Sequence, residues 1–252
     1  MATEFAGQTA IVTGASRGIG KAVATLFAAH GAALVLVARG QDALDCLARE
    51  FAGQGARVTT FAGDICDPVV ADAVLSHAER EYGGVDVLAN IAGAYPTALL
   101  AETTDQQFAA TVAVNLTGTF VMCRTVLPRM LARGRGSIVN MSSTAARLPT
   151  PGLSVYGAAK AGVEAFTRAI AVEAAPRVRV NAVSAGPTMT EAVEALMASD
   201  QTGAVDTVTR ALPLQRLARP AEIAEAVVFL ASSRASFVTG QVLHANGGGF
   251  MA

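Results

Sequence analysis

The N-terminal stretch that decides the fold reads TAIVTGASRGIG from Thr9 to Gly20. Its first five residues are mostly apolar or β-branched, as in a buried strand, and a helix is predicted from about Ile19 to His30. The glycines between them allow a sharp turn and a close backbone approach, while free N–H groups at a helix N-terminus attract a pyrophosphate. The stretch therefore predicts a strand, a phosphate-binding turn and a helix.

The same rhythm continues along the chain. Apolar runs that alternate with Ala-rich helical segments predict βαβ units, and nearly continuous apolar strands are typical of a parallel sheet covered on both faces. We expect a Rossmann-like, doubly wound, three-layer α/β/α fold of about seven parallel strands, in a single domain over residues 1–252. The strands are predicted at Thr9–Thr13, Ala33–Ala38, Arg57–Phe61, Val85–Asn90, Ser137–Met141, Val178–Val183 and Gln241–Ala245.

One long segment, residues 187–219, departs from this rhythm and carries scattered apolar residues such as Met189, Leu196 and Met197. Long irregular segments inside compact domains are often functional, so we predict a substrate lid at about 187–219. A surface helical pair without function is the alternative.

The composition is apolar, with 52% hydrophobic and 15% charged residues and a formal net charge of -1. Without a block of like charges, the sequence predicts neither nucleic-acid nor membrane-surface binding, and a small-molecule substrate is favoured. The start of the chain lacks the pattern of a signal peptide, so a cytoplasmic protein is expected. The least charged stretch, Gln106–Cys123, approaches the length of a membrane helix, but its polar residues favour a buried or interface helix.

Cysteine and histidine residues are few and widely separated. Cys46, Cys66 and Cys123 have no CxxC spacing and are predicted to be reduced and mostly buried. The three histidines lie on separate segments, so no metal site is predicted.

The end of the second strand bears on the choice of cofactor. An NAD site usually has an acidic residue there for the ribose 2′-hydroxyl, whereas an NADP site offers Arg to the 2′-phosphate. This strand ends in Ala38-Arg39, and Arg17 in the glycine turn would supply a second cation. NADP(H) is therefore favoured over NAD(H), the alternative being that both arginines are ordinary surface charges. Asp64 is placed to accept from an adenine amino group, although a loop-capping Asp would look the same.

Tyr156 and Lys160 lie four apart at the start of an Ala-rich helical stretch, and therefore on one face. A nearby ammonium favours the phenolate, so we expect Lys160 to lower the pKa of Tyr156 and make it an acid/base group. Ser143 follows the strand Ser137–Met141 at the edge where such sheets bind ligands, and its hydroxyl is predicted to bond the substrate oxygen. Ser142 is the rival for that role.

With these motifs the chain closely resembles the short-chain dehydrogenase/reductase family, in particular 3-oxoacyl-[acyl-carrier-protein] reductases. The resemblance covers nearly the whole length. It rests on TGASRGIG (13 to 20), GD (63 to 64), Asn90-Ile91-Ala92-Gly93, Asn115, the set Ser143, Tyr156 and Lys160, the segment Asn181–Thr190, and Thr239-Gly240-Gln241.

The resemblance implies a catalytic tetrad of Asn115, Ser143, Tyr156 and Lys160. Ser143 lies 13 positions before Tyr156, which is the family's spacing and selects it over Ser142. By the same resemblance Ser143 contacts the substrate. Met189 in the predicted lid is a further candidate substrate contact, as is Tyr95 just after Asn90–Gly93, for which a core aromatic is the alternative. The implied cofactor contacts are Gly14, Ser16, Arg17, Gly18, Ile19, Gly20, Arg39, Asp64, Ile65, Asn90, Ala92, Gly93, Tyr156, Lys160, Gly186, Thr188 and Thr190.

The resemblance also bears on partners. Family members are commonly homotetramers packed through two long helices, which here contain Gln106–Leu131 and Tyr156–Ala175. Carrier-protein reductases tend to carry Arg where this chain has Val172, which argues against docking of an acyl carrier protein. Arg129, Arg133 and Arg135 would be the residues of a basic docking patch.

We therefore expect an NADP(H)-dependent oxidoreductase that reduces a ketone, a 3-oxoacyl thioester or a similar carbonyl compound, to a secondary alcohol. The alternative is an NAD(P)-dependent dehydrogenase that oxidises a sugar alcohol, a steroid or a terpene alcohol. A dinucleotide-sensing regulator is the third hypothesis, and it is disfavoured because such a protein would not need the complete tetrad.

Overall fold

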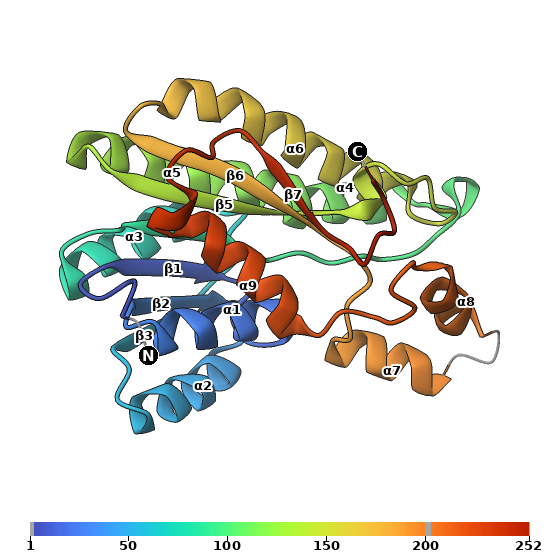
Figure 1. Ribbon diagram of the computed structural model, residues 1–252, viewed down its shortest axis with the longest axis horizontal. Coiled ribbons are helices and arrows are strands. Elements are labelled where there is room, and N and C mark those ends of the chain that lie inside the picture. Colours follow the sequence, from blue (N-terminus) through green and yellow to red (C-terminus); the bar gives the residue numbers. More distant parts are fainter. Residues whose placement is uncertain (1–2, 200–202, 252) are drawn as a thin grey trace.

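The computed structural model describes residues 3–199 and 203–251, whose strands form one parallel sheet in the order β3-β2-β1-β4-β5-β6-β7 (Figure 1). The predicted Rossmann-like fold is confirmed. The observed strand bounds differ from the predicted ones by two residues at most: β4 begins later than predicted, and β5 and β6 extend further than their apolar runs. The strands are β1 (Thr9–Thr13), β2 (Ala33–Ala38), β3 (Val58–Ala62), β4 (Val87–Asn90), β5 (Gly136–Ser143), β6 (Val178–Ala185) and β7 (Val242–Ala245).

Helices cover both faces of the sheet (Figure 1). One face is packed by α1, α2 and α9, which bury Phe27, Leu44 and Ile223 respectively. The other is packed by α3, α5 and α6, with Val74, Met122 and Ile170 in the core. The helices are α1 (Gly18–Ala29), α2 (Gln41–Gly53), α3 (Pro68–Tyr82), α4 (Asp105–Val112), α5 (Gly118–Arg133), α6 (Ser154–Ala174), α7 (Glu191–Ser199), α8 (Ala204–Ala211) and α9 (Pro220–Ala231).

The strand order reverses between β1 and β4. After β3 the chain crosses back and pairs β4 with the free side of β1, so that the connections on either side run in opposite directions. In open α/β sheets a crevice forms at this point, outside the carboxyl ends of the strands. The residues that follow β1, β4, β5 and β6 therefore meet at one edge of the sheet.

The run Asp105–Arg133 joins α4 and α5 through a π-helical turn, Ala113–Thr117. Its length and its mean hydropathy of 1.3 would suffice to cross a membrane. In this fold, however, Val121, Met122 and Val126 are buried against the sheet. The later part of the run therefore packs on the core, whereas residues 105–110 are exposed.

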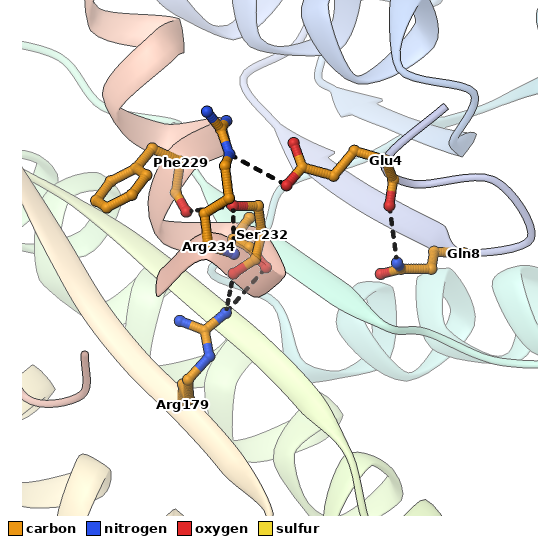
Figure 2. A network of polar contacts seen from close by, with 7 residues as sticks. Glu4, Gln8, Arg179, Phe229, Ser232 and Arg234 are labelled. Atoms are coloured by element: carbon orange, nitrogen blue, oxygen red, sulfur yellow. Dashed lines mark hydrogen bonds and ion pairs between the residues drawn. The ribbon is translucent and has the colours of Figure 1, made fainter. Parts of the chain in front are cut away.

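A polar network fastens the end of α9 to β6 and to the N-terminal segment (Figure 2). The Arg179 guanidinium donates to the carbonyl oxygens of Leu230, Ala231 and Ser232 at 2.7, 3.0 and 2.9 Å. Arg234 just beyond α9 pairs with Glu4 at 3.1 Å. A cation at the C-terminus of a helix donates to the unpaired carbonyls of the last turn and interacts favourably with the helix dipole. This network therefore fixes α9 against the sheet.

All three cysteines are free thiols, but the expectation that they are mostly buried is wrong for Cys46, which is exposed. The buried side of α2 carries Leu44, Leu47 and Phe51, which leaves Cys46 on the outer side of that helix. Cys66 is half-buried and Cys123 is buried.

Candidate active site

The glycine turn after β1 lies directly against the backbone that follows β4. Gly14 has φ +67°, and a Cβ built there would stand 2.8 Å from Cα of Ala92. A Cβ on Gly20 would overlap the carbonyl oxygen of Gly14, so α1 can start this close to the turn only with glycine. Both glycines keep side chains out of the space in front of α1, as a phosphate-binding turn requires.

The N-terminus of α1 offers N–H groups to a ligand. Its N-cap is Arg17, and no side chain at that position caps the helix. Glu191 at the start of α7 accepts from the Gly18 N–H at 3.4 Å. A Cβ built on Gly18 would stand 3.3 Å from the methyl carbon of Thr190, so the start of α7 faces the phosphate turn.

Thr13 is a site residue that the sequence prediction missed. Its hydroxyl oxygen accepts from the N–H groups of Ile91 and Ala92 at 3.0 and 3.2 Å, which joins the end of β1 to the segment after β4. Asn90 points the other way, donating to Asn140 at 2.9 Å and Cys123 at 3.3 Å. The Asn90 side chain therefore belongs to the core, and only its backbone lies at the predicted cofactor crevice.

The two arginines predicted to select the cofactor are both exposed, and within the described residues neither forms an ion pair. Arg39 directly follows β2, and no carboxylate stands there. Asp64 accepts from the Cys66 N–H at 2.9 Å, and this bond, helped by the charge of Arg39, lowers the pKa of Asp64. Asp64 thus caps its own loop, the alternative recognised from the sequence. Ile65 is buried against Gly118.

Asn115 lies in the π-helical turn between α4 and α5 and is fully buried. Its amide donates to the carbonyls of Ala94 and Thr111 at 2.7 and 3.0 Å, and its Oδ1 accepts from the Ala94 N–H at 3.3 Å. Such π turns within α-helices are frequent at functional sites. Here the turn brings Asn115 against the loop that follows β4.

Lys160 is 2% exposed, and its ammonium donates to the carbonyl oxygen of Met141 at 2.8 Å. Burial lowers the pKa of Lys160 to about 8. A Cβ on Gly93 would stand 2.8 Å from Oδ1 of Asn115 and 3.4 Å from Nζ of Lys160. Glycine at 93 therefore leaves room for both polar groups, which a side chain there would crowd.

The pKa of Tyr156 is raised, which corrects the expectation that Lys160 lowers it. Burial is the main cause, a hydrogen bond with Ser143 acts in the opposite direction, and Tyr95 adds a small increase. Nζ of Lys160 lies 5.8 Å from the centre of the Tyr156 ring and is bonded to Met141 instead. In this structure burial therefore outweighs any effect of the ammonium, and Tyr156 is a protonated phenol at neutral pH.

The two adjacent serines at the end of β5 have different partners. The hydroxyl of Ser142 is buried and donates to Oε1 of Glu164 at 3.0 Å. Ser143 is half-buried, acts on Tyr156 by lowering the pKa of its phenol, and accepts from the Ala145 N–H at 3.2 Å. The structure therefore brings Ser143, not Ser142, together with Tyr156.

Of the other predicted substrate contacts, Tyr95 lies beside Tyr156, whereas Met189 is placed by the segment that follows β6. The Tyr95 ring stands edge-on to the Tyr156 ring at 6.4 Å between centres. Met189 lies after β6, where its N–H donates to the Ala218 carbonyl at 2.8 Å. A cavity of about 20 Å³ adjoins Tyr156 and is lined by Pro96, Ala98, Thr103, Gln107, Thr111, Gly152 and Val155, which the sequence prediction did not include.

The predicted lid segment forms α7 and α8 beyond the carboxyl end of β6 (Figure 1). Its base is fixed to the fold, because Thr188 is bridged to Ala218 and its hydroxyl donates to Gly186 at 2.9 Å. Leu196 and Met197 on α7 expose about half of their side chains. An apolar surface on a segment beside the glycine turn suits a lid, and that function stays a prediction.

A larger hollow of about 480 Å³ lies on the β7 side of this base. It is lined by apolar residues including Leu212 and Ile223, by the ion pair of Arg216 and Glu222, and by His244. None of the four predicted tetrad residues contributes to it.

A family model described as enoyl-(acyl carrier protein) reductase matches residues 14–249. A crystal structure of a short-chain dehydrogenase/reductase from Brucella melitensis, titled a glucose/ribitol dehydrogenase, superposes with a TM-score of 0.92 at 37% identity, covering 100% of both chains. The chain belongs to the short-chain dehydrogenase/reductase family. It is therefore a member of an oxidoreductase family, and a nicotinamide dinucleotide is the cofactor that this family implies.

Relatives in this family have diverse names. The chain is 41% identical over 252 residues to a cis-4-hydroxycyclohexanecarboxylate dehydrogenase of Sinomonas cyclohexanicum, covering 98% of each chain. It is 38% identical over 246 residues to a 3-oxoacyl-[acyl-carrier-protein] reductase of Vibrio cholerae, covering 97% of this chain and 98% of the relative. It is 34% identical to a 2,3-dihydro-2,3-dihydroxybenzoate dehydrogenase of Bacillus subtilis, covering 96% and 95%.

The residues of this dehydrogenase/reductase fit a dinucleotide. The turn after β1 has glycine where any Cβ would meet backbone, and the N-cap residue Arg17 does not cap α1 with its side chain, which leaves the N-terminus of α1 with only the long contact from Gly18 to Glu191. The adjoining tetrad side chains line the same edge of the sheet.

Proposed function

We propose that this protein is an NADP(H)-dependent reductase that converts a ketone, a 3-oxoacyl thioester or a similar carbonyl compound, to a secondary alcohol. The observation that carries the proposal is the group formed by Ser143, Tyr156 and Lys160 beside Asn115, at the edge of the sheet where α1 begins. Bound NADPH would supply the hydride for the carbonyl carbon. All other steps fall to the side chains of the chain itself.

Tyr156 is the proton donor in this proposal. Because its pKa is raised by burial, the phenol carries its proton at neutral pH, which is the form that gives a proton to the developing alkoxide. The Ser143 hydroxyl would donate a hydrogen bond to the same substrate oxygen as negative charge develops. Lys160, with a pKa of about 8, exchanges protons readily near neutral pH and would return a proton to the phenolate, and it would also hold the ribose of the cofactor. Asn115 would hold the water through which this proton is replaced.

The preference for NADP(H) rests on charge at the end of β2. Arg39 and Arg17 are exposed, and no ion pair within the described residues competes for either guanidinium. A guanidinium pairs well with a phosphate, and no carboxylate stands at this position to repel the 2′-phosphate or to bind a 2′-hydroxyl. The glycine turn and the N-terminus of α1 would hold the pyrophosphate.

The direct test is a titration of the protein with NADPH and with NADH, followed by nicotinamide fluorescence. We expect tighter binding of NADPH, and selective weakening of NADPH binding in Arg39→Ala. The matched control is Arg49→Ala, since Arg49 is an exposed arginine on α2 away from the turn. Equal or tighter binding of NADH by the unaltered protein would contradict the NADP(H) assignment.

A second candidate is oxidation of a cyclic alcohol. The relative from Sinomonas cyclohexanicum is named a dehydrogenase of a hydroxylated cyclohexane carboxylate, and the relative from Bacillus subtilis a dehydrogenase of a dihydroxylated ring acid. The sequence alternatives, a sugar alcohol, a steroid or a terpene alcohol, belong to the same reaction class. Turnover with NAD⁺ and alicyclic alcohols, without reduction of 3-oxoacyl thioesters by NADPH, would favour this candidate.

Carrier-protein docking has little support. Arg129 pairs with Glu79 at 3.3 Å, and Arg133 and Arg135 both pair with Asp86, at 3.4 and 3.1 Å. These partners neutralise much of the charge that a basic docking patch would need, so we propose that a free or coenzyme-bound substrate is used.

We further propose that the protein is a homotetramer built on the exposed sides of the run Asp105–Arg133 and of α6. Phe108 on the first is 54% exposed and Val172 on the second is 80% exposed. Apolar side chains at this exposure favour a subunit contact. Light scattering that gives the mass of a single chain at micromolar concentration would contradict this.

A further inference from the structure

The segment that carries Ser143 is fastened at both ends to one buried carboxylate. Glu164 on α6 is 1% exposed, although it is a charged residue. Its Oε1 accepts from Ser142, immediately before Ser143, at 3.0 Å. Its Oε2 accepts from Nε of Arg147, four residues after Ser143, at 2.7 Å. The intervening backbone is a short turn, so both of its ends are tied to the same side chain.

Glu164 belongs to the helix that also carries the other acid/base groups. It follows Lys160 by four residues, which places the two side chains on one face of α6. The same helix packs on the serine turn at a second point, because a Cβ on Gly157 would stand 2.6 Å from the carbonyl oxygen of Ala145. The position of Ser143 relative to Tyr156 is therefore set by contacts between α6 and the turn.

A buried carboxylate holds its partners firmly. Removing a partner leaves charge away from water, so the ionised form of Glu164 strongly favours the arrangement in which Ser142 and Arg147 both donate to it. Groups that orient a reacting side chain in this way act through precise placement, and a displacement of about 1 Å at a reaction centre can lower turnover about 100-fold.

We propose that Glu164 is a positioning residue, which through Ser142 and Arg147 holds Ser143 at the place where it meets Tyr156 and the substrate oxygen. This inference rests on the proposed reductase function. It goes beyond the tetrad, because Glu164 and Arg147 touch neither cofactor nor substrate in the proposal and act through the serine turn alone.

The chain offers a matched control for this idea. Arg168 also pairs with Oε2 of Glu164, at 3.9 Å, but it lies on α6 itself, four residues further along. Arg147 and Arg168 expose similar fractions of their side chains, 43% and 48%. Loss of either weakens an ion pair of the same carboxylate, but only loss of Arg147 releases the serine turn.

The experiment compares Arg147→Gln, Glu164→Gln and Arg168→Gln with the unaltered protein, measuring kcat, the Kd for NADPH, and hydrogen exchange of backbone residues 143–148. We expect the first two to lower kcat about 10- to 100-fold with unchanged NADPH affinity and faster exchange in the turn. Arg168→Gln should leave all three quantities unchanged, and Arg147→Lys should recover part of the lost kcat.

Equal effects of Arg147→Gln and Arg168→Gln on kcat and exchange would overturn the proposal, as would loss of NADPH affinity in proportion to kcat. If Glu164→Gln does not fold, Arg147→Gln still decides the matter, because it removes a half-exposed side chain. If the unaltered protein reduces no carbonyl compound, the proposed function fails, while the exchange measurement still tests whether Glu164 holds the turn.

Discussion

The buried ammonium of Lys160 should destabilise the protein more at neutral pH than at alkaline pH. Burial lowers the pKa of Lys160 from 10.5 to about 8, so between these two pH values the unfolded chain binds more protons than the folded one. The free energy of unfolding then rises with pH across this window. At about 1.4 kcal/mol per pKa unit, the lysine destabilises the fold by about 3 kcal/mol at pH 7.

The replacement Lys160→Met removes this effect and keeps a side chain of similar length. It also removes the hydrogen bond to Met141, whose net contribution is about 1 kcal/mol. We therefore expect the variant to be more stable than the unaltered protein by about 2 kcal/mol at pH 7, and the two to be nearly equal at pH 10. It should also have lost catalytic turnover.

The assay is urea unfolding of both proteins at several pH values from 7 to 10, without cofactor. Burial raises the pKa of Cys66 to about 11 and of Cys123 to about 12, but these groups are present in both proteins and drop out of the difference. Lys21→Met, at an exposed lysine, is the control and should follow the unaltered protein. If the Lys160→Met and unaltered curves run parallel from pH 7 to 10, the argument from burial is wrong.

Three further variants test other parts of the site. Gly20→Ala should abolish cofactor binding, measured by fluorescence titration, because its methyl group would overlap the backbone of the phosphate turn. Glu191→Gln should tighten NADPH binding, since its carboxylate lies 3.4 Å from the Gly18 nitrogen where the pyrophosphate is expected; an unchanged Kd would show that the two do not compete. The Ser143 hydroxyl lowers the pKa of Tyr156, so Ser143→Ala should raise that pKa. Because oxidation of an alcohol needs the phenolate, the rising limb of its pH–rate profile should move to higher pH, and a limb at the original pH would argue against the interaction.

The strands and the parallel, doubly wound class of the fold could be predicted because the signals of the strands and of the glycine turn are local. Apolar runs such as Ala33–Ala38 match the structure residue for residue, and the glycines after Thr13 mark the turn that begins α1. Strand ends were less certain: β5 continues through polar Ser142 and Ser143, because pairing with β6 holds residues whose type alone does not predict a strand.

The parts of the site that could not be predicted depend on contacts between distant residues. The spacing of Tyr156 and Lys160 places them on one face but does not show that the ammonium bonds to Met141, so the direction of the Tyr156 pKa was predicted wrongly. Likewise nothing in the sequence indicates a π-helical turn at Asn115, or that Glu164 reaches back to Arg147. These features arise from packing and burial, which appear only once the chain is folded.

Proton transfer by Tyr156 is tested by Tyr156→Phe, because only the hydroxyl is removed. The ring contact with Tyr95 and the backbone of α6 should remain. With the best carbonyl substrate found in a screen with NADPH, we expect kcat to fall by a factor of about 100 to 10,000 while the Kd for NADPH stays unchanged. A kcat close to that of the unaltered protein would contradict the account.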